Sequence, residues 1–191
     1  MRRTLFLFLL ILAGLVPAAL AVDEAQERRI RSGLKLFRAL LAADEDIAAK
    51  ADGKGKLLLV VLYVENRKLA EGFATELEQL GKGDKRGIIR KLPIEVQVSN
   101  DLSTKLFQDR VPAGIYMVEK LFDDDINRLV NYGIKNHVII YSPFDGDVNK
   151  GILAGLSIET RVRPYINFHT MHKSKIRIKQ FFLKVAKRYE P

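Results

Sequence analysis

The segment Asp145-Gly146-Asp147-Val148-Asn149 has the spacing of oxygen ligands that opens a calcium loop, D-x-D-x-N. Calcium takes six to eight oxygen ligands, and an EF-hand loop needs Gly at its sixth position and a bidentate Glu at its twelfth. Those two positions are Lys150 and Leu156 in this chain. The pattern is broken twice, so the sequence predicts a polar turn between two strands and no metal site.

Two histidines have a spacing that suits zinc. His169 and His172 are three residues apart, which puts both on one face of a helix. Their neighbours Lys173 and Lys175 repel a cation, and the chain contains no cysteine that would complete a ligand set. We therefore predict a surface pair, which retains the ability of neutral histidines to respond to acidity.

Phosphate-binding and nucleophilic motifs are also incomplete. The glycine-rich segment 81–87 follows a predicted helix and continues with Ile88-Ile89, whereas a Walker loop follows a strand and ends in G-K-[ST]. No serine lies in a G-x-S-x-G setting. The sequence predicts a flexible connector at 81–87, no enzymatic activity and no cofactor.

The N-terminus indicates export. Met1-Arg2-Arg3 is cationic, Thr4 to Val16 is almost unbroken apolar sequence, and Ala19-Leu20-Ala21 offers the small residues that a signal peptidase recognises. The apolar core is short for a membrane span, although a retained N-terminal anchor is the alternative. We predict a signal peptide over residues 1–21, cleavage after Ala21 and a periplasmic protein. Predicted export argues against functions driven by nucleotides and against nucleic-acid binding.

Composition indicates one globular domain over residues 22–191. Hydrophobic residues make up 48% of the chain and charged residues 29%, and no cysteine is present, so stability must come from packing without disulfides. The formal net charge of +9 suits acidic partners or anionic membrane surfaces, with a merely solubilising charge as the alternative.

Hydrophobic periodicity predicts an α/β fold with a mainly parallel sheet flanked by helices. Helices are expected at 24–43, 66–80 and 123–132, the last ended by Gly133. Strands are expected at 56–64, 93–98, 113–118 and 136–141. Segments 152–158 and 162–168 then predict a C-terminal antiparallel β-hairpin. A terminal amphipathic helix is predicted from Ile178, Phe181, Phe182, Val185 and Tyr189.

The C-terminal third carries a family resemblance. Its parts are the Gly-rich strand Gly151–Leu156, the return segment Arg161–Asn167 with its final Ile-Asn, and the paired apolar residues of Phe181–Ala186. This pattern resembles the YfiR-like periplasmic proteins, and the layout of the chain is similar over roughly Leu34–Tyr189. The resemblance is specific only from Gly151 onwards.

The resemblance implies a non-catalytic regulator that binds the periplasmic part of a membrane signalling protein, a sensor kinase or a diguanylate cyclase. The best-understood member of that family uses disulfides, and the absence of cysteine excludes thiol-based control here. For partner binding we select Arg163, Asn167, Lys184 and Arg188, although Asn167 also suits a helix cap. Peripheral membrane contact through the basic C-terminal segment and a homodimer both stay open.

The main alternative is a periplasmic protein that binds a small solute. In open α/β sheets, ligands bind beyond the carboxyl ends of the strands. The residues expected at that rim are Glu65, Asn66, Ser99, Asn100, Glu119 and Ser142. A polar pocket there favours the solute-binding protein, and an exposed apolar patch near the hairpin or first helix favours the regulator. An unrecognised hydrolase would need a nucleophile and a base in such a pocket.

Overall fold

The computed structural model describes residues 16–102 and 110–190, with side chains from residue 24 onwards. The chain divides into two units, 1–32 and 33–191. The first contains the N-terminal part of helix α2 (Val16–Ala43), and Arg28 pairs there with Glu24 at 3.3 Å. The predicted cleavage after Ala21 falls within α2 and stays a prediction, whereas the apolar run before Val16 lies outside the described residues.

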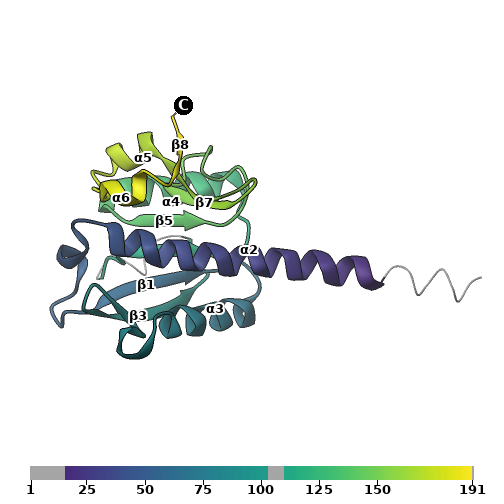
Figure 1. The fold of residues 1–191 in the computed structure, drawn as a ribbon, viewed down its shortest axis with the longest axis horizontal. Coiled ribbons are helices and arrows are strands. Elements are labelled where there is room, and N and C mark those ends of the chain that lie inside the picture. The colour runs from purple at the N-terminus through teal and green to yellow at the C-terminus, as the bar shows by residue number, and fades with distance from the viewer. Residues whose placement is uncertain (1–15, 103–109, 191) are drawn as a thin grey trace, which may run out of the picture. The chain divides into compact units, whose positions relative to one another are not determined.

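The second unit is an α/β domain (Figure 1). Its helical elements after α2 are the short turns η1 (Ile47–Lys50) and η2 (Gly83–Lys85) and the helices α3 (Arg67–Gln79), α4 (Asp123–Asn136), α5 (Phe168–Lys173) and α6 (Gln180–Leu183). Its strands are β1 (Leu57–Leu62), β2 (Ile88–Ile89), β3 (Leu92–Ser99), β4 (Gly114–Met117), β5 (Ile139–Ser142), β6 (Ala154–Ile158), β7 (Val162–Asn167) and β8 (Lys187–Tyr189). No helix in these ranges is both long and apolar enough to cross a membrane.

The eight strands form one sheet in the order β2-β3-β1-β4-β5-β6-β7-β8. All neighbours are parallel except the pairs β2–β3 and β6–β7, which confirms the predicted mainly parallel sheet and C-terminal hairpin. Every residue of β1 is buried, as its continuous apolar sequence predicts for a central strand. The short hairpin strand β2 was not predicted, because two apolar residues carry too little pattern.

Helices cover both faces of the sheet. On one face, Phe37 of α2 packs against Tyr116 of β4 and Tyr141 of β5, with ring centroids 5.4 and 5.8 Å away. The opposite face carries Ile140, whose side chain meets Gly133 of α4. Each buried ring of the first cluster contributes about 2–3 kcal/mol through removal of apolar surface from water.

The prediction that Gly133 ends its helix was wrong. α4 continues to Asn136, and His137 takes the left-handed C-terminal position with φ of 58°. A Cβ on Gly133 would lie 2.9 Å from Ile140 Cδ1, so glycine is needed here for close packing of helix on strand. Sequence alone does not distinguish these two uses of a glycine.

The predicted terminal amphipathic helix is also wrong. Only Gln180–Leu183 is helical, and Lys187–Tyr189 forms strand β8, parallel to β7. Phe182 is buried, but Phe181 and Val185 are 64% and 57% exposed, so the apolar residues do not share one covered face. Ile178 forms an isolated bridge with Asp44, which fixes the chain in an extended conformation before the short helix.

Candidate functional site

The carboxyl ends of the parallel strands bring the predicted rim residues to one edge of the sheet. Leu62 of β1 lies beside Ser99 of β3 and Met117 of β4, and the predicted residues follow these strand ends. The predicted rim residues therefore lie at the carboxyl edge of the sheet. Most of these side chains form hydrogen bonds within the chain instead of facing an open ligand site.

Glu119 holds the turn between β1 and α3. Its Oε2 accepts backbone N–H bonds from Val64, Glu65 and Asn66, at 2.8, 3.0 and 3.0 Å. Burial raises the pKa of Glu119, but the three N–H bonds outweigh burial and leave the pKa below its usual value. Asn66 caps α3 by accepting from the N–H of Leu69 at 2.9 Å. The three N–H groups would suit an anionic ligand, but the Glu119 carboxylate of the chain itself already accepts their hydrogen bonds.

The two rim serines also serve internal bonds. Ser142 is fully buried, donates to Asp147 Oδ2 at 2.6 Å and accepts from the N–H of Phe144 at 3.1 Å. Ser99 accepts from the N–H of Asp101 at 3.0 Å. Burial raises the pKa of Asp147, with the Ser142 hydrogen bond acting in the opposite direction. Glu65, Asn66 and Asn100 are the exposed rim residues, and the Asn66 side chain is already used in the helix cap.

A hollow of about 590 Å³ lies at this edge, but none of the six predicted rim residues lines it. Its walls are residues 120–124 and Lys150, and an ion pair of 2.5 Å joins Lys150 to Asp123. Phe122 projects there with 82% of its surface exposed. The hollow is open and carries mixed charge, and it contains no hydroxyl or thiol nucleophile.

The motif residues considered for metals have separate partners. Asp147 bonds to Ser142, and Asn149 accepts a hydrogen bond from the Tyr165 hydroxyl at 3.0 Å. His172 packs edge-on against Phe168, with centroids 6.1 Å apart. Within residues 16–102 and 110–190, no group of three or more His, Asp or Glu side chains is arranged to hold a metal ion.

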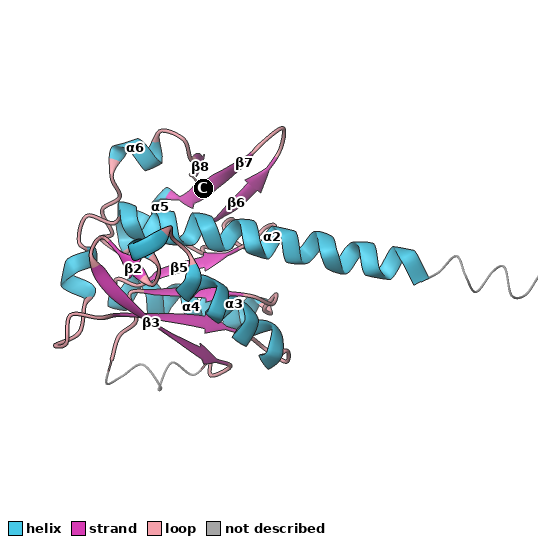
Figure 2. Ribbon diagram, turned by 60° about the horizontal axis from the view of Figure 1, so that its bottom comes forward, coloured by secondary structure: helices cyan, strands magenta, loops and turns pink. Residues whose placement is uncertain are grey.

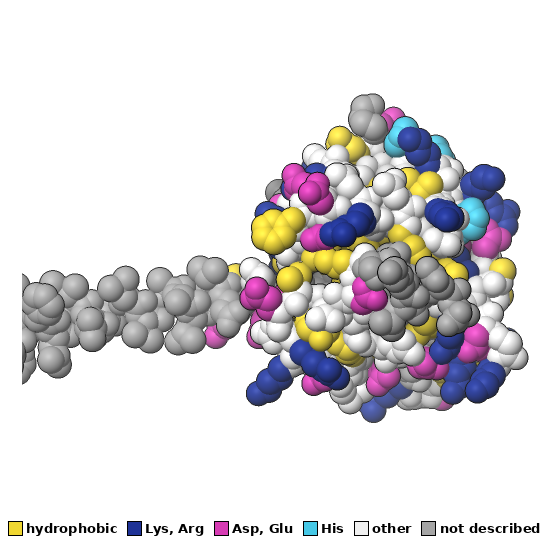
Figure 3. All heavy atoms as spheres, turned by 180° about the vertical axis from the view of Figure 1, so that it is seen from behind, with side chains coloured by type: hydrophobic (Ala, Val, Ile, Leu, Met, Phe, Trp, Pro, Cys, Tyr) yellow, Lys and Arg dark blue, Asp and Glu magenta, His cyan; other side chains and the backbone are white. Residues whose placement is uncertain are grey.

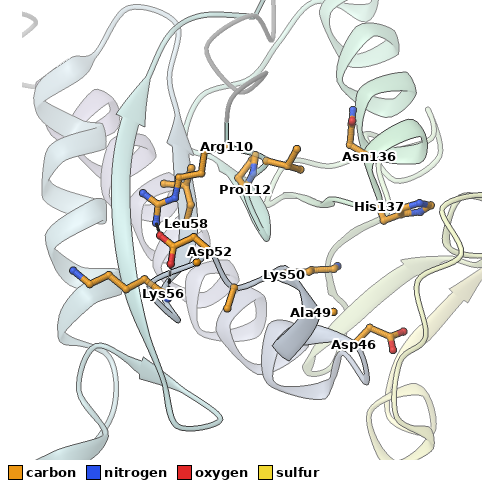
Figure 4. Close-up of a pocket in the computed structure, with 13 residues that line it drawn as sticks. Asp46, Ala49, Lys50, Asp52, Lys56, Leu58, Arg110, Pro112, Asn136 and His137 are labelled. Carbon is orange, nitrogen blue, oxygen red and sulfur yellow. Dashed lines mark hydrogen bonds and ion pairs between the residues drawn. The ribbon is translucent and has the colours of Figure 1, made fainter.

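The opposite edge, at the amino ends of β1, β4 and β5, contains a cavity of about 660 Å³ (Figure 4). Its lining comes from three separate segments: 46–58, 110–112 and 136–137. Figure 4 shows Arg110 and Asp52 on one wall and Asp46, Lys50 and His137 on the other. The sequence did not indicate this cavity, because the three segments are far apart and none contains a recognisable motif.

Paired charges organise one wall of the cavity. Arg110 binds Asp52 and Glu95, each at 2.8 Å. The Lys56 N–H lowers the pKa of Asp52 most, burial opposes it, and Arg110 adds to the lowering. The hydrogen bond from Arg110 is the first cause of the lowered pKa of Glu95. Arg110 therefore joins the cavity wall to β3.

The second wall joins the cavity to the C-terminal segment. Lys50 binds the fully buried Asp44 at 2.7 Å. Arg177 binds Asp46, and its hydrogen bond is the main cause of the lowered pKa of that carboxyl. His137 Nδ1 lies 2.8 Å from the Ser174 carbonyl oxygen, which can only accept, so Nδ1 carries the proton. The His137 Nε2 takes no part in this bond, and the lining as a whole suits a polar, charged ligand.

The four residues selected for partner binding have different environments. Asn167 is buried, donates to the Val148 carbonyl and caps α5 by accepting from Thr170, so it serves the fold. Arg163 binds Glu159 at 2.8 Å. Lys184 is exposed, and the guanidinium of Arg188 lies 4.0 Å from the centre of the Phe168 ring.

Comparison with known proteins defines a fold class. The chain matches no protein-family profile, and no curated protein matches its sequence. It is similar to a solved α/β structure, the ABC domain in complex with L-Trp from Streptococcus pneumonia. The two are 13% identical, with a TM-score of 0.54 over 83% of this chain and 61% of that one. A conserved domain protein from Vibrio cholerae O1 biovar El Tor is 11% identical, with a TM-score of 0.48 over 70% and 54% of the two chains. This chain spans about three fifths of the length of the first structure, and the likeness shows the fold alone.

Proposed function

We propose that this chain is a non-catalytic binding protein that holds a protein partner through the end of its β6–β7 hairpin. The observation that carries the proposal is the length of that hairpin. β5 pairs with β6 only as far as Gly155, and β8 pairs with β7 only from Tyr165 onwards. Residues 156–164 therefore extend beyond both neighbouring strands, and we call them the hairpin arm (Figure 2).

The chemistry of the hairpin arm supports a protein partner. Ile158 and Val162 are cross-strand neighbours near its tip and are 50% and 47% exposed. On the β5 side, the last strand pair is Ser142–Gly155, so the carbonyl of Leu156 and both backbone groups of Ile158 have no strand partner in the described chain. An extended segment of a partner that pairs with this edge would satisfy those groups and cover the two apolar side chains.

Internal hydrogen bonds already use the polar groups at the carboxyl edge of the sheet, and this favours a protein partner over a solute bound there. A solute at the carboxyl edge would have to displace Glu119 from three N–H donors and Ser142 from Asp147. With export and the YfiR-like resemblance, we propose that the partner is the periplasmic part of a membrane signalling protein. The chain's part in signalling is then to occupy or release that domain.

A photo-crosslinking amino acid at Val162, compared with one at the more exposed Phe122, tests the proposal in intact envelopes. We expect the Val162 probe to crosslink one membrane signalling protein, and Ile158→Lys in the same chain to abolish the product. Equal products from both probes, or none from Val162, would contradict the hairpin arm as the binding surface.

A small-ligand function is the second candidate, favoured by the 660 Å³ cavity and by the similarity to a domain solved with L-Trp. Its site would lie at the amino edge, opposite the rim predicted from sequence. Titration calorimetry with amino acids, L-Trp included, tests it. The heat of ligand binding should be lost in Arg110→Ala. It should be kept in the control Arg67→Ala, which removes only an exposed ion pair with Glu71. This result would establish the cavity as a binding site.

A further inference from the structure

The charge of the chain is concentrated at its C-terminal end. Residues 159–190 contain nine Lys and Arg but only two acids, Glu159 and Glu190. Figure 3 shows Lys and Arg side chains gathered around histidines along one edge of the face that it presents. What this charge can bind depends on which of the cations are free.

The arginines of this region are mostly committed to acids. Arg163 binds Glu159, Arg177 binds Asp46 and Glu45, and Arg188 binds Glu190. Four lysines, in contrast, form no ion pair within the described chain: Lys173, Lys175, Lys179 and Lys184. Arg161, in the hairpin arm, also forms no ion pair within the described chain. From Lys173 to Lys184 the free charge is therefore lysine charge, which attracts anions without the directed fork of arginine.

Exposed apolar side chains lie among these lysines. Gln180, Phe181, Lys184 and Val185 occupy the outer face of the turn that begins with α6, while Phe182 faces inward. Phe181 and Val185 are one turn apart and are 64% and 57% exposed, with Lys184 between them. We call Lys179, Phe181, Lys184 and Val185 the C-terminal patch.

The segment around the C-terminal patch is anchored to the domain. Lys184 and Arg188 line a hollow of about 240 Å³ together with Phe168 of α5, and Arg188 lies over the Phe168 ring. The N–H of Lys179 bonds to the Ala43 carbonyl at 3.0 Å. Phe181 and Val185 are thus held outward by a fixed backbone.

We propose that the C-terminal patch docks on an anionic lipid surface. Phe181 and Val185 enter the interfacial region, and the surrounding lysines lie among the acidic headgroups. A bilayer suits this patch better than an acidic protein, because carboxylates are recognised most specifically by arginine forks, and Arg177 and Arg188, which flank the patch in the sequence, are already paired. This surface is separate from the hairpin arm, so its failure would leave the proposed function untouched.

The chain contains no tryptophan, so Phe181→Trp introduces a single tryptophan, whose emission is excited apart from that of the tyrosines and reports on this position. The full chain is mixed with vesicles of phosphatidylcholine, or of phosphatidylcholine and phosphatidylglycerol in equal parts. We expect blue-shifted emission, reversed by salt, with the anionic vesicles only. A local signal is needed because binding of the apolar run Thr4–Val16 to either kind of vesicle would otherwise be counted as binding of the patch. Phe122→Trp, at an exposed phenylalanine outside the C-terminal patch, is the matched control and should not shift.

Charge reversal tests the lysines. Each lysine near an anionic surface strengthens binding roughly fivefold, so Lys179→Glu with Lys184→Glu should weaken the Phe181→Trp response by about tenfold or more. Lys68→Glu, on the exposed side of α3, should leave it unchanged. The proposal is overturned by no shift, by equal shifts at both tryptophans, by equal shifts with both vesicles, or by a shift with polyglutamate and none with vesicles.

Discussion

At the scale of single residues, Glu119 shows that a side chain can occupy the place where a ligand is expected. Its carboxylate accepts three N–H bonds at the start of α3. Glu119→Ala leaves these donors without a charged acceptor and should reduce the free energy of unfolding by about 2–3 kcal/mol, and Glu119→Gln by less. Urea unfolding monitored by circular dichroism measures both, with Glu65→Gln, an exposed neighbour, expected to be neutral.

The pH dependence of Glu119 gives a second measurement. Its folded pKa is below the ordinary value of 4.5, so its stabilisation is complete above pH 4.5 and is lost as the pH falls through the folded pKa. The difference in stability between the parent chain and Glu119→Gln should therefore shrink in acid. A difference that stays constant from pH 7 to below pH 4 would show that the charge of Glu119 does not matter.

Asp147 should behave in the opposite way. It is fully buried, Oδ1 has no hydrogen-bond partner among the residues that the structure describes, and burial raises its folded pKa. The ionised carboxylate therefore costs stability at neutral pH, and this cost disappears as the pH falls toward 3.8, where the unfolded state also binds the proton. Asp147→Asn should stabilise the chain at pH 7 and have little effect near pH 4. Destabilisation at pH 7 would mean that the amide cannot replace the bond from Ser142.

At the scale of elements, glycines decide how closely helices approach the sheet. A Cβ on Gly114 of β4 would lie 2.8 Å from Phe37 Cζ, inside the ring cluster. Gly114→Ala should therefore cost about 1–3 kcal/mol through overpacking. Gly72→Ala is the matched control, since nothing lies within 4 Å of that position on α3 and alanine favours a helix by about 1 kcal/mol. Thermal unfolding should move in opposite directions for the two variants.

Elements with a strong pattern could be predicted from sequence, and the weaker ones could not. The continuous apolar run of β1 and the Asn66 cap of α3 are local signals, and both predictions were confirmed. The C-terminal segment has helical spacing, but pairing with β7 overrides that spacing, and pairing is not visible in one segment. The cavity at the amino edge depends on Asp46, Arg110 and His137, which only the folded sheet brings together.

At the scale of the whole molecule, hydrogen exchange should distinguish the backbone amides that the fold protects from the amides that stay accessible to a partner. Amides of β1, which pairs on both sides with β3 and β4, should exchange most slowly. The outward amide of Ile158 in the hairpin arm should exchange fast, because the last β5 pair is Ser142–Gly155 and β5 does not reach Ile158. The measurement is made at two protein concentrations. Slow exchange at Ile158 only at the higher concentration would identify a second copy as the occupant of this edge. Slow exchange at both concentrations would contradict the free edge on which the proposed partner binding rests.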